Sequence, residues 1–204
     1  IGGGGPWGVM VDQDMENSEK YVVYLHQSGL GLPDRDYYLK NAPESVRVRT
    51  AYEKHLDAIF ALIGETNAQS KKNRSTVMRI ETALARISMP KEDLRDVDKT
   101  YHKKSLAQLQ TLAKNVDGGS YLTILGAKPK DVVVMQPKFL KAASAMLATV
   151  PLDEWKTYLA WHLVGGSAGY LTAKFEKQSF AFYGTTLSGA KVMMLKGLVG
   201  CPLI

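Results

Sequence analysis

Apolar residues recur at helical spacing through the first half of the chain. Pro43 and Glu44 offer a helix start, because proline suits the first turn and an acid suits the positive end of the helix dipole. The pattern continues to Gly64, which is typical of a helix end. Residues 68–88 predict a second amphipathic helix that ends before Pro90. The positions expected to be buried in the first helix are Tyr52, Leu56, Ile59, Phe60 and Ile63.

The same pattern continues in the second half. A short helix is predicted over 105–114, closed by the glycine pair 118–119. Another is predicted over 139–150, and a new one begins at 152, where acids occupy the first turn. After 165–166 the helical pattern resumes as far as about residue 183. The positions expected to be buried in this last segment are Tyr170, Leu171, Phe175 and Phe182.

Two short segments have the composition of β-strands. Residues 20–25 (KYVVYL) and 132–135 (VVVM) are rich in β-branched and aromatic residues. Residues 1–10 contain four consecutive glycines and are predicted to be a linker or a cloning scar. The predicted fold class is therefore all-α, with at most one small two-stranded β element.

Composition is that of an ordinary globular chain. Its 204 residues are 45% hydrophobic and 23% charged, which suffices for a core without disulfides. The single cysteine, Cys201, excludes an internal disulfide. No run of about 18 uninterrupted apolar residues is present, so no transmembrane helix is predicted.

The net charge of +6 is unevenly distributed. Residues 1–100 carry 14 basic and 15 acidic side chains, whereas residues 101–204 carry 12 and 5. The lysines of the second half are dispersed, and the densest basic cluster, 71–74 (KKNR), lies in the neutral half. Because no nucleic-acid-binding motif accompanies it, the pattern indicates a solvated basic face and no nucleic-acid partner.

None of the four histidines has the sequence partners of a known metal motif. A zinc helix of the His-Glu-x-x-His type needs a second histidine four residues on, and His26, His55, His102 and His162 all lack one. Asp98 and His102 are four residues apart, which on a helix would place a carboxylate beside an imidazole. A surface ion pair explains these two residues better than catalysis does.

Three other segments suggest functional sites that their residues or their context do not support. The acids within 92–98 lack the glycine and terminal glutamate of a calcium loop, so they are expected to be helix caps. The glycines of the loop 29–35 match no phosphate-binding motif, which favours a structural turn. Segment 165–169 (GGSAG) fits the nucleophile-elbow pattern, but a helix precedes it and no histidine follows it. Cys201 has no base beside it in the sequence.

Six segments carry a resemblance to a known family. Within residues 11–39 lies the run GLGLPDRDYYL, and in order along the chain follow ETALA (81–85), RDVDKTYHKKSLAQLQ (95–110), DVVVMQPKFL (131–140), LDEWKTYLAW (152–161) and FYGTTLSG (182–189). Together these resemble the N-terminal region of the neprilysin, endothelin-converting-enzyme and PepO family of zinc metallopeptidases. The specific structural motif comprises Gly29, Leu30, Gly31, Leu32, Pro33, Arg35, Asp36, Tyr37 and Tyr38.

The resemblance implies a role in a larger enzyme. Full-length relatives enclose a chamber between two largely helical lobes, and this chain is similar to the lobe that caps it. The parent would be a zinc endopeptidase of short peptides, and the cap would restrict substrate size. No catalytic, cofactor-binding or metal-binding residue is assigned here, zinc is expected only in the parent, and the chain alone is expected to be inactive. The alternative is a freestanding helical interaction module with a basic face.

The matching region has limits in the sequence. Residues 11–190 are assigned to the capping region, and residues 191–204 depart from the family pattern. The resemblance implies the zinc-bearing lobe as partner, and short peptides in the full-length enzyme. A lobe separated from its partner exposes apolar surface, which predicts self-association. The sequence leaves the compartment open, and the resemblance weakly favours an extracytoplasmic one for a bacterial parent.

Overall fold

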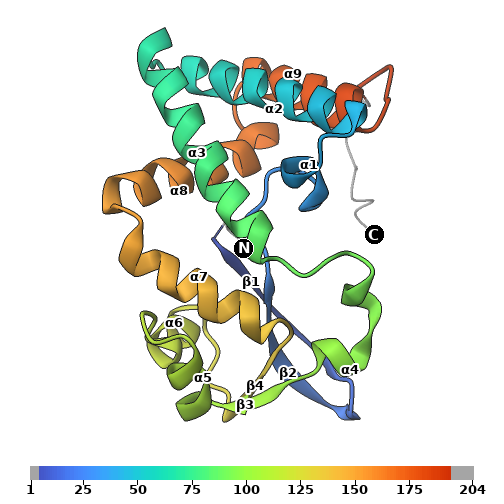
Figure 1. Ribbon diagram of the computed structural model, residues 1–204, viewed down its shortest axis with the longest axis vertical. Helices are drawn as coiled ribbons and strands as arrows, with labels where there is room; N and C mark the ends of the chain where they lie inside the picture. Colours follow the sequence, from blue (N-terminus) through green and yellow to red (C-terminus); the bar gives the residue numbers. More distant parts are fainter. Residues whose placement is uncertain (1–4, 194–204) are drawn as a thin grey trace, which may run out of the picture.

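One mixed four-stranded sheet lies toward one end of the molecule, and α2 and α9 lie at the other (Figure 1). The computed structural model describes residues 5–193. The sheet has the order β1-β2-β4-β3, in which β2 and β4 are parallel and the two outer pairs are antiparallel. Its strands are β1 (Trp7–Asp14), β2 (Asn17–Gln27), β3 (Lys103–Ser105) and β4 (Asp131–Val134).

Helices make up most of the remaining described chain, which confirms the predicted mainly helical fold. The α-helices are α1 (Asp36–Leu39), α2 (Pro43–Leu62), α3 (Asn67–Ile87), α4 (Val97–Thr100), α5 (Leu106–Leu112), α6 (Gly118–Ile124), α7 (Pro137–Thr149), α8 (Leu152–Ser167) and α9 (Ala173–Ser179). Two 3-10 turns, η1 (Asp93–Arg95) and η2 (Ala168–Tyr170), and a π-helix, η3 (Phe180–Leu187), complete the list.

The sheet has four strands where at most two were predicted. Strand β1 was missed because its residues 10–13 are exposed on both faces, so no alternation of apolar and polar positions marks it. Trp7 is nevertheless buried and pairs with Gln27 of β2. The linker prediction is therefore wrong for residues 7–10. Strand β3 has only three residues, and its lysines carry no strand signal.

The glycine pairs also differ from their predicted roles. Gly118 and Gly119 do not end α5 but begin α6, because Asp117 caps the new helix by accepting the Ser120 N–H. A side chain at Gly118 would lie 2.7 Å from Leu109 Cδ2, so the glycine lets α5 and α6 pack closely.

Tyr170 and Leu171 were predicted to be buried and are exposed. The 3-10 turn η2 breaks the helical period after α8, so the spacing that pointed both side chains inward is lost. Tyr170 is 90% exposed, whereas Phe182 is buried as predicted.

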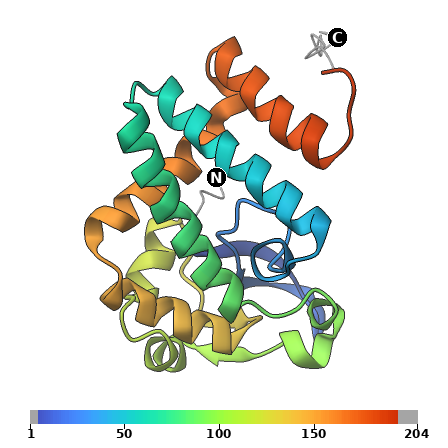
Figure 2. The same ribbon diagram turned by 45° about the horizontal axis from the view of Figure 1, so that its top comes forward.

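Two large apolar cores share the long helix α3 and the helix α8. Figure 2 shows α3 running from beside α2 to beside α7. The first packs one face of the sheet against α3, α5, α6, α7 and the start of α8, and includes Ile80, Leu84 and Tyr158. The second lies between α1, α2, α3, the end of α8 and η3, and includes Tyr52 and Trp161. Leu30, which follows β2, packs against both cores. The loop after β2 is therefore held where the two cores meet.

Asp14 ties the end of β1 to the segment before β4. Its carboxylate accepts hydrogen bonds from Lys103 Nζ and from Tyr101 Oη, each at 2.7 Å. The Lys103 ammonium, followed by the Tyr101 hydroxyl, lowers the pKa of Asp14 to about 2. The folded protein therefore favours the ionised carboxylate.

The stability that Asp14 contributes is expected to depend on pH. Because its pKa in the folded protein is below the usual 3.8, the contribution is present above about pH 4 and is lost as the pH falls toward 2. Urea unfolding of wild type and Asp14→Asn should give free energies of unfolding that differ at pH 6 and converge near pH 2. Asp12→Asn, on the exposed part of β1, is the matched control. A difference that stays constant from pH 6 to pH 2 would contradict the ion pair.

None of the helices in the described part of the chain is long and apolar enough to cross a bilayer.

Candidate functional site

The motif loop, residues 28–35, connects β2 to α1 and is bound by three tyrosine hydroxyls. Tyr158 Oη donates to the Gly29 carbonyl at 2.9 Å, and Tyr183 Oη donates to the Gly31 carbonyl at 3.4 Å. Tyr38 Oη accepts the Leu32 N–H at 2.9 Å. The sequence predicted the turn but not its contacts with Tyr158 and Tyr183, which come from elements more than 120 residues away.

The glycines of the motif make these approaches possible. A Cβ atom at Gly31 would lie 1.8 Å from Tyr52 Oη, and one at Gly29 would lie 2.4 Å from Tyr158 Oη. Gly29 also has a φ of +88°, which side-chain-bearing residues rarely adopt. The structural turn predicted for this loop is therefore present, and its glycines leave the space in which the tyrosine hydroxyls pack against the backbone.

Glu81 of α3 is the centre of a buried polar network behind the motif loop. Its side chain is 0% exposed and accepts hydrogen bonds from Tyr38 Oη at 2.7 Å and Tyr52 Oη at 3.0 Å. His162 Nε2 lies 3.1 Å from Glu81 Oε1. A buried carboxylate needs such partners, because desolvation without them is costly. The network therefore joins α1, α2, α3 and α8 around one charge.

The tyrosines of this network are held in their protonated form. Burial, followed by the charge of Glu81, raises the pKa of Tyr38, Tyr52 and Tyr158 well above the usual value. The same two causes raise the pKa of Tyr183. Their hydroxyls remain hydrogen-bond donors at neutral pH, so the arrangement fixes the loop and offers no proton for acid-base chemistry.

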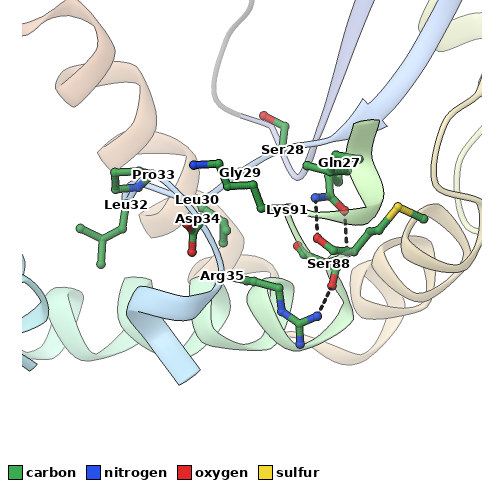
Figure 3. A pocket seen from close by; sticks show the side chains of 12 residues that line it. Gln27, Ser28, Gly29, Leu30, Leu32, Pro33, Asp34, Arg35, Ser88 and Lys91 are labelled. Carbon is green, nitrogen blue, oxygen red and sulfur yellow. Dashed lines mark hydrogen bonds between the residues drawn. The ribbon is translucent and has the colours of Figure 1, made fainter. Parts of the chain in front are cut away.

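A cavity of about 340 Å³ lies between the motif loop and the segment after α3 (Figure 3). Arg35 spans it and donates to the Ser88 carbonyl at 2.8 Å. Gln27 makes a two-way pair with Met89, accepting its N–H at 2.7 Å and donating to its carbonyl at 3.1 Å. No histidine or cysteine is among the described residues that line the cavity. The Ser88 hydroxyl donates to the Leu84 carbonyl at 2.8 Å, and no hydrogen bond joins Ser28 to a basic group in the described chain, so no serine here is activated by a base.

No ring contact or hydrogen bond in the described part of the chain joins any two of the four histidines, although His55 and His162 both pack against Trp161. His55 packs against Phe182 with ring centroids 4.9 Å apart, and burial lowers its pKa to about 4. His26 packs against Gly8 in the sheet, and burial lowers its pKa as well. His162 belongs to the Glu81 network, and His102 lines a second cavity. Packing explains the positions of His26 and His55, and the contact with Glu81 explains that of His162.

The other candidates from the sequence also find structural positions. Helix α4 ends at Thr100, so Asp98 and His102 do not share a helix face, although both line the second cavity. Asp96 caps α4 by accepting the Asp98 N–H, as expected for this acidic stretch. Segment 165–169 lies at the end of α8 and in η2, without the strand that a nucleophile elbow requires. Cys201 lies outside the described residues.

Comparison with known proteins decides the family. A family model for an N-terminal domain, described as Peptidase family M13, matches residues 1–196. This chain belongs to peptidase family M13. The resemblance found in the sequence is thereby confirmed, and the match extends past both ends of the region predicted at 11–190.

Relatives of this M13 chain are much longer than it is. Human endothelin-converting enzyme 1 is 33% identical over 187 residues, which are 87% of this chain and 24% of that protein. Neprilysin-2 of Drosophila melanogaster is 31% identical over 182 residues, which are 86% of this chain and 23% of that protein. The M13 chain thus spans about a quarter of the length of these relatives.

Solved structures share the fold of the M13 chain. The zinc metalloprotease Zmp1 of Mycobacterium tuberculosis, in complex with an inhibitor, matches with a TM-score of 0.88 and 35% identity, covering 94% of this chain and 30% of that one. PepO from Lactobacillus rhamnosis matches with a TM-score of 0.71 over 91% of this chain and 30% of its own, and at 20% identity it shows the fold alone.

The described part of the M13 chain does not fit a zinc ion. Residues 5–193 contain no group of three or more histidine, cysteine, aspartate or glutamate side chains placed to hold a metal. Protein zinc sites use three or four such ligands. The absence of a cofactor in the whole chain stays a prediction.

Proposed function

We propose that this chain is the capping region of a longer M13 zinc endopeptidase and does not hydrolyse peptides by itself. One combination of findings carries the proposal. The M13 family model matches nearly the whole chain, and the described residues contain no cluster of side chains that could hold a metal. The chain spans about a quarter of its relatives, and structural neighbours bear the name zinc metalloprotease. The zinc ligands are expected in the rest of such a longer protein.

A cap of this kind acts by its shape. It excludes bulky chains from an enclosed chamber and admits short peptides, while removing water from the site it covers. Such a role requires a surface that keeps its form. The buried Glu81 network and the three tyrosine contacts to the motif loop supply that rigidity.

Exposed leucines on α8 support contact with a further lobe. Leu152, Leu159 and Leu163 are 69%, 46% and 69% exposed, although a helix of an isolated domain usually turns such residues inward. The same surface supports the self-association predicted for the chain alone. A freestanding module with a basic face is not favoured, because the family match accounts for the whole described chain.

The proposal is tested by assaying the purified chain against a fluorogenic peptide in the presence of zinc. We expect no hydrolysis above buffer, no effect of a chelator, and no stoichiometric zinc by atomic absorption. Full-length Zmp1 under the same conditions is the positive control. Chelator-sensitive hydrolysis by the chain alone would overturn the proposal.

A further inference from the structure

A second cavity, of about 790 Å³, shares Ser88 and Met89 with the motif-loop cavity. It lies between the end of α3, the segment that contains α4, the end of α5 and the first turn of α7. Its apolar lining includes Ile87, Leu112 and Phe139. This cavity takes no part in the cap proposed above.

The first turn of α7 opens into this cavity without a side-chain cap. Pro137 occupies the first helical position, so the N–H groups that need partners are those of Lys138 and Phe139. Neither N–H has a hydrogen-bond partner among residues 5–193. The side chain of the N-cap residue, Gln136, does not serve them, because its Oε1 accepts the Gln27 N–H at 2.8 Å.

Gln136 itself supplies an unused donor. Its side chain is only 4% exposed and lines the cavity, yet its Nε2 donates to no atom of the described chain. This Nε2 is not among the fully buried unpartnered atoms of the described chain, so it keeps contact with the cavity and can donate to an acceptor brought by a ligand. The site thus presents three N–H donors at the positive end of a 13-residue helix.

The charges around the cavity favour an anion. Asp93 is neutralised by Lys99 at 2.5 Å. Two other lining residues, Lys104 and Lys138, are cationic and form no ion pair in the described part of the chain. Asp98 is the one remaining carboxylate among the described lining residues, so positive charge exceeds negative charge around the cavity.

We propose that this cavity binds a carboxylate attached to an apolar group. The carboxylate would accept the N–H groups of Lys138 and Phe139 and the Gln136 amide, with Lys104 adding charge, and the apolar group would pack against Leu112 and Ile87. The chemistry is shared by two sources, the C-terminus of a peptide that ends in an apolar residue and a short fatty acid. This inference does not depend on the proposed cap function.

Calorimetric titration of the purified chain with N-acetyl-Leu-Phe tests the proposal. We expect saturable binding, and at least about tenfold weaker binding of the same dipeptide as its C-terminal amide, which lacks the negative charge. Octanoate separates the sources: equal affinity would assign fatty acids, and weaker affinity would assign peptide termini. Equal affinity for the acid and the amide, or no saturable binding of any probe, would overturn the proposal.

Variants locate the site. Gln136→Glu keeps an oxygen for the Gln27 N–H but replaces the donor Nε2 with a negatively charged oxygen. This charge would repel the carboxylate of the ligand, so binding should weaken about tenfold or more. Lys104→Gln should weaken it about three- to tenfold without touching the buried network. Lys141→Gln is the matched control, since Lys141 is an exposed residue of α7 outside the cavity, and its affinity should stay within about twofold. Equal losses in Lys104→Gln and Lys141→Gln would contradict a local site.

Discussion

Replacing Glu81 with alanine is expected to lower the free energy of unfolding by about 3–5 kcal/mol. The substitution removes the acceptor of two buried hydroxyls, those of Tyr38 and Tyr52, and leaves a cavity between α1, α2 and α3. Unpaired buried donors keep their full desolvation cost, which is why the loss exceeds that of an ordinary hydrogen bond. Because Tyr38 also holds the Leu32 N–H, the motif loop is expected to loosen as well.

Urea and thermal unfolding measure this effect. For a chain of about 200 residues the midpoint temperature is expected to fall by roughly 6–20 °C. Glu44→Ala is the control, because Glu44 forms an exposed ion pair with Arg47, and exposed pairs of this kind contribute little to stability. Glu81→Gln should be intermediate, since it keeps the shape and one acceptor oxygen. A loss in Glu81→Ala no larger than that in Glu44→Ala would show that the network is not structural.

Gly31→Ala is expected to destabilise the fold by about 2–3 kcal/mol. Its methyl group would lie 1.8 Å from Tyr52 Oη and 2.5 Å from Tyr52 Cζ, and Tyr52 is fully buried and bonded to Glu81. Gly31 is not among the glycines with positive φ in the described chain, so the cost comes from the contact and not from backbone strain. Urea unfolding at pH 7 measures it.

Two further variants separate the effect of the contact with Tyr52 from the general effect of replacing a glycine with alanine. Gly166→Ala in α8 meets no atom within 4 Å and should stabilise the protein by about 0.5–1 kcal/mol, because alanine favours a helix. Tyr52→Phe removes the oxygen nearest the new methyl group. In that background Gly31→Ala should cost at least about 1 kcal/mol less than in wild type. Strict additivity of the two substitutions would contradict a direct clash.

The long helices could be predicted closely from the sequence. Helix α2 runs from Pro43 to Leu62 and α3 from Asn67 to Ile87, each within one or two residues of its predicted ends. Both have a sustained apolar stripe and clear end signals, which depend only on neighbouring residues. The π-helix after α9 and the exposed Tyr170 were not predicted, because the 3-10 turn η2 and the π-helix η3 depart from the 3.6-residue period on which the prediction depends.

The motif loop could be recognised from sequence, but its partners could not. Its glycines and its proline predict a defined turn between two secondary-structure elements. Glu81 lies on the apolar face of α3 that Val77, Ile80 and Leu84 form. A carboxylate at such a position is the one sequence feature that indicates a buried polar contact there. Tyr158 and Tyr183 gave none, since a buried aromatic residue is ordinarily core.

The sequence by itself determined that this chain is mainly helical, where its main helices lie, and to which family it belongs, because these follow from local spacing and from runs of characteristic residues. Only the tertiary structure decided that β1 and β3 complete the sheet, that Glu81 joins four helices, and that the Gln136 amide is left without an acceptor. Each of these depends on pairing between residues that are distant along the chain, and the free energy of such a contact is set by burial and geometry that no local pattern records.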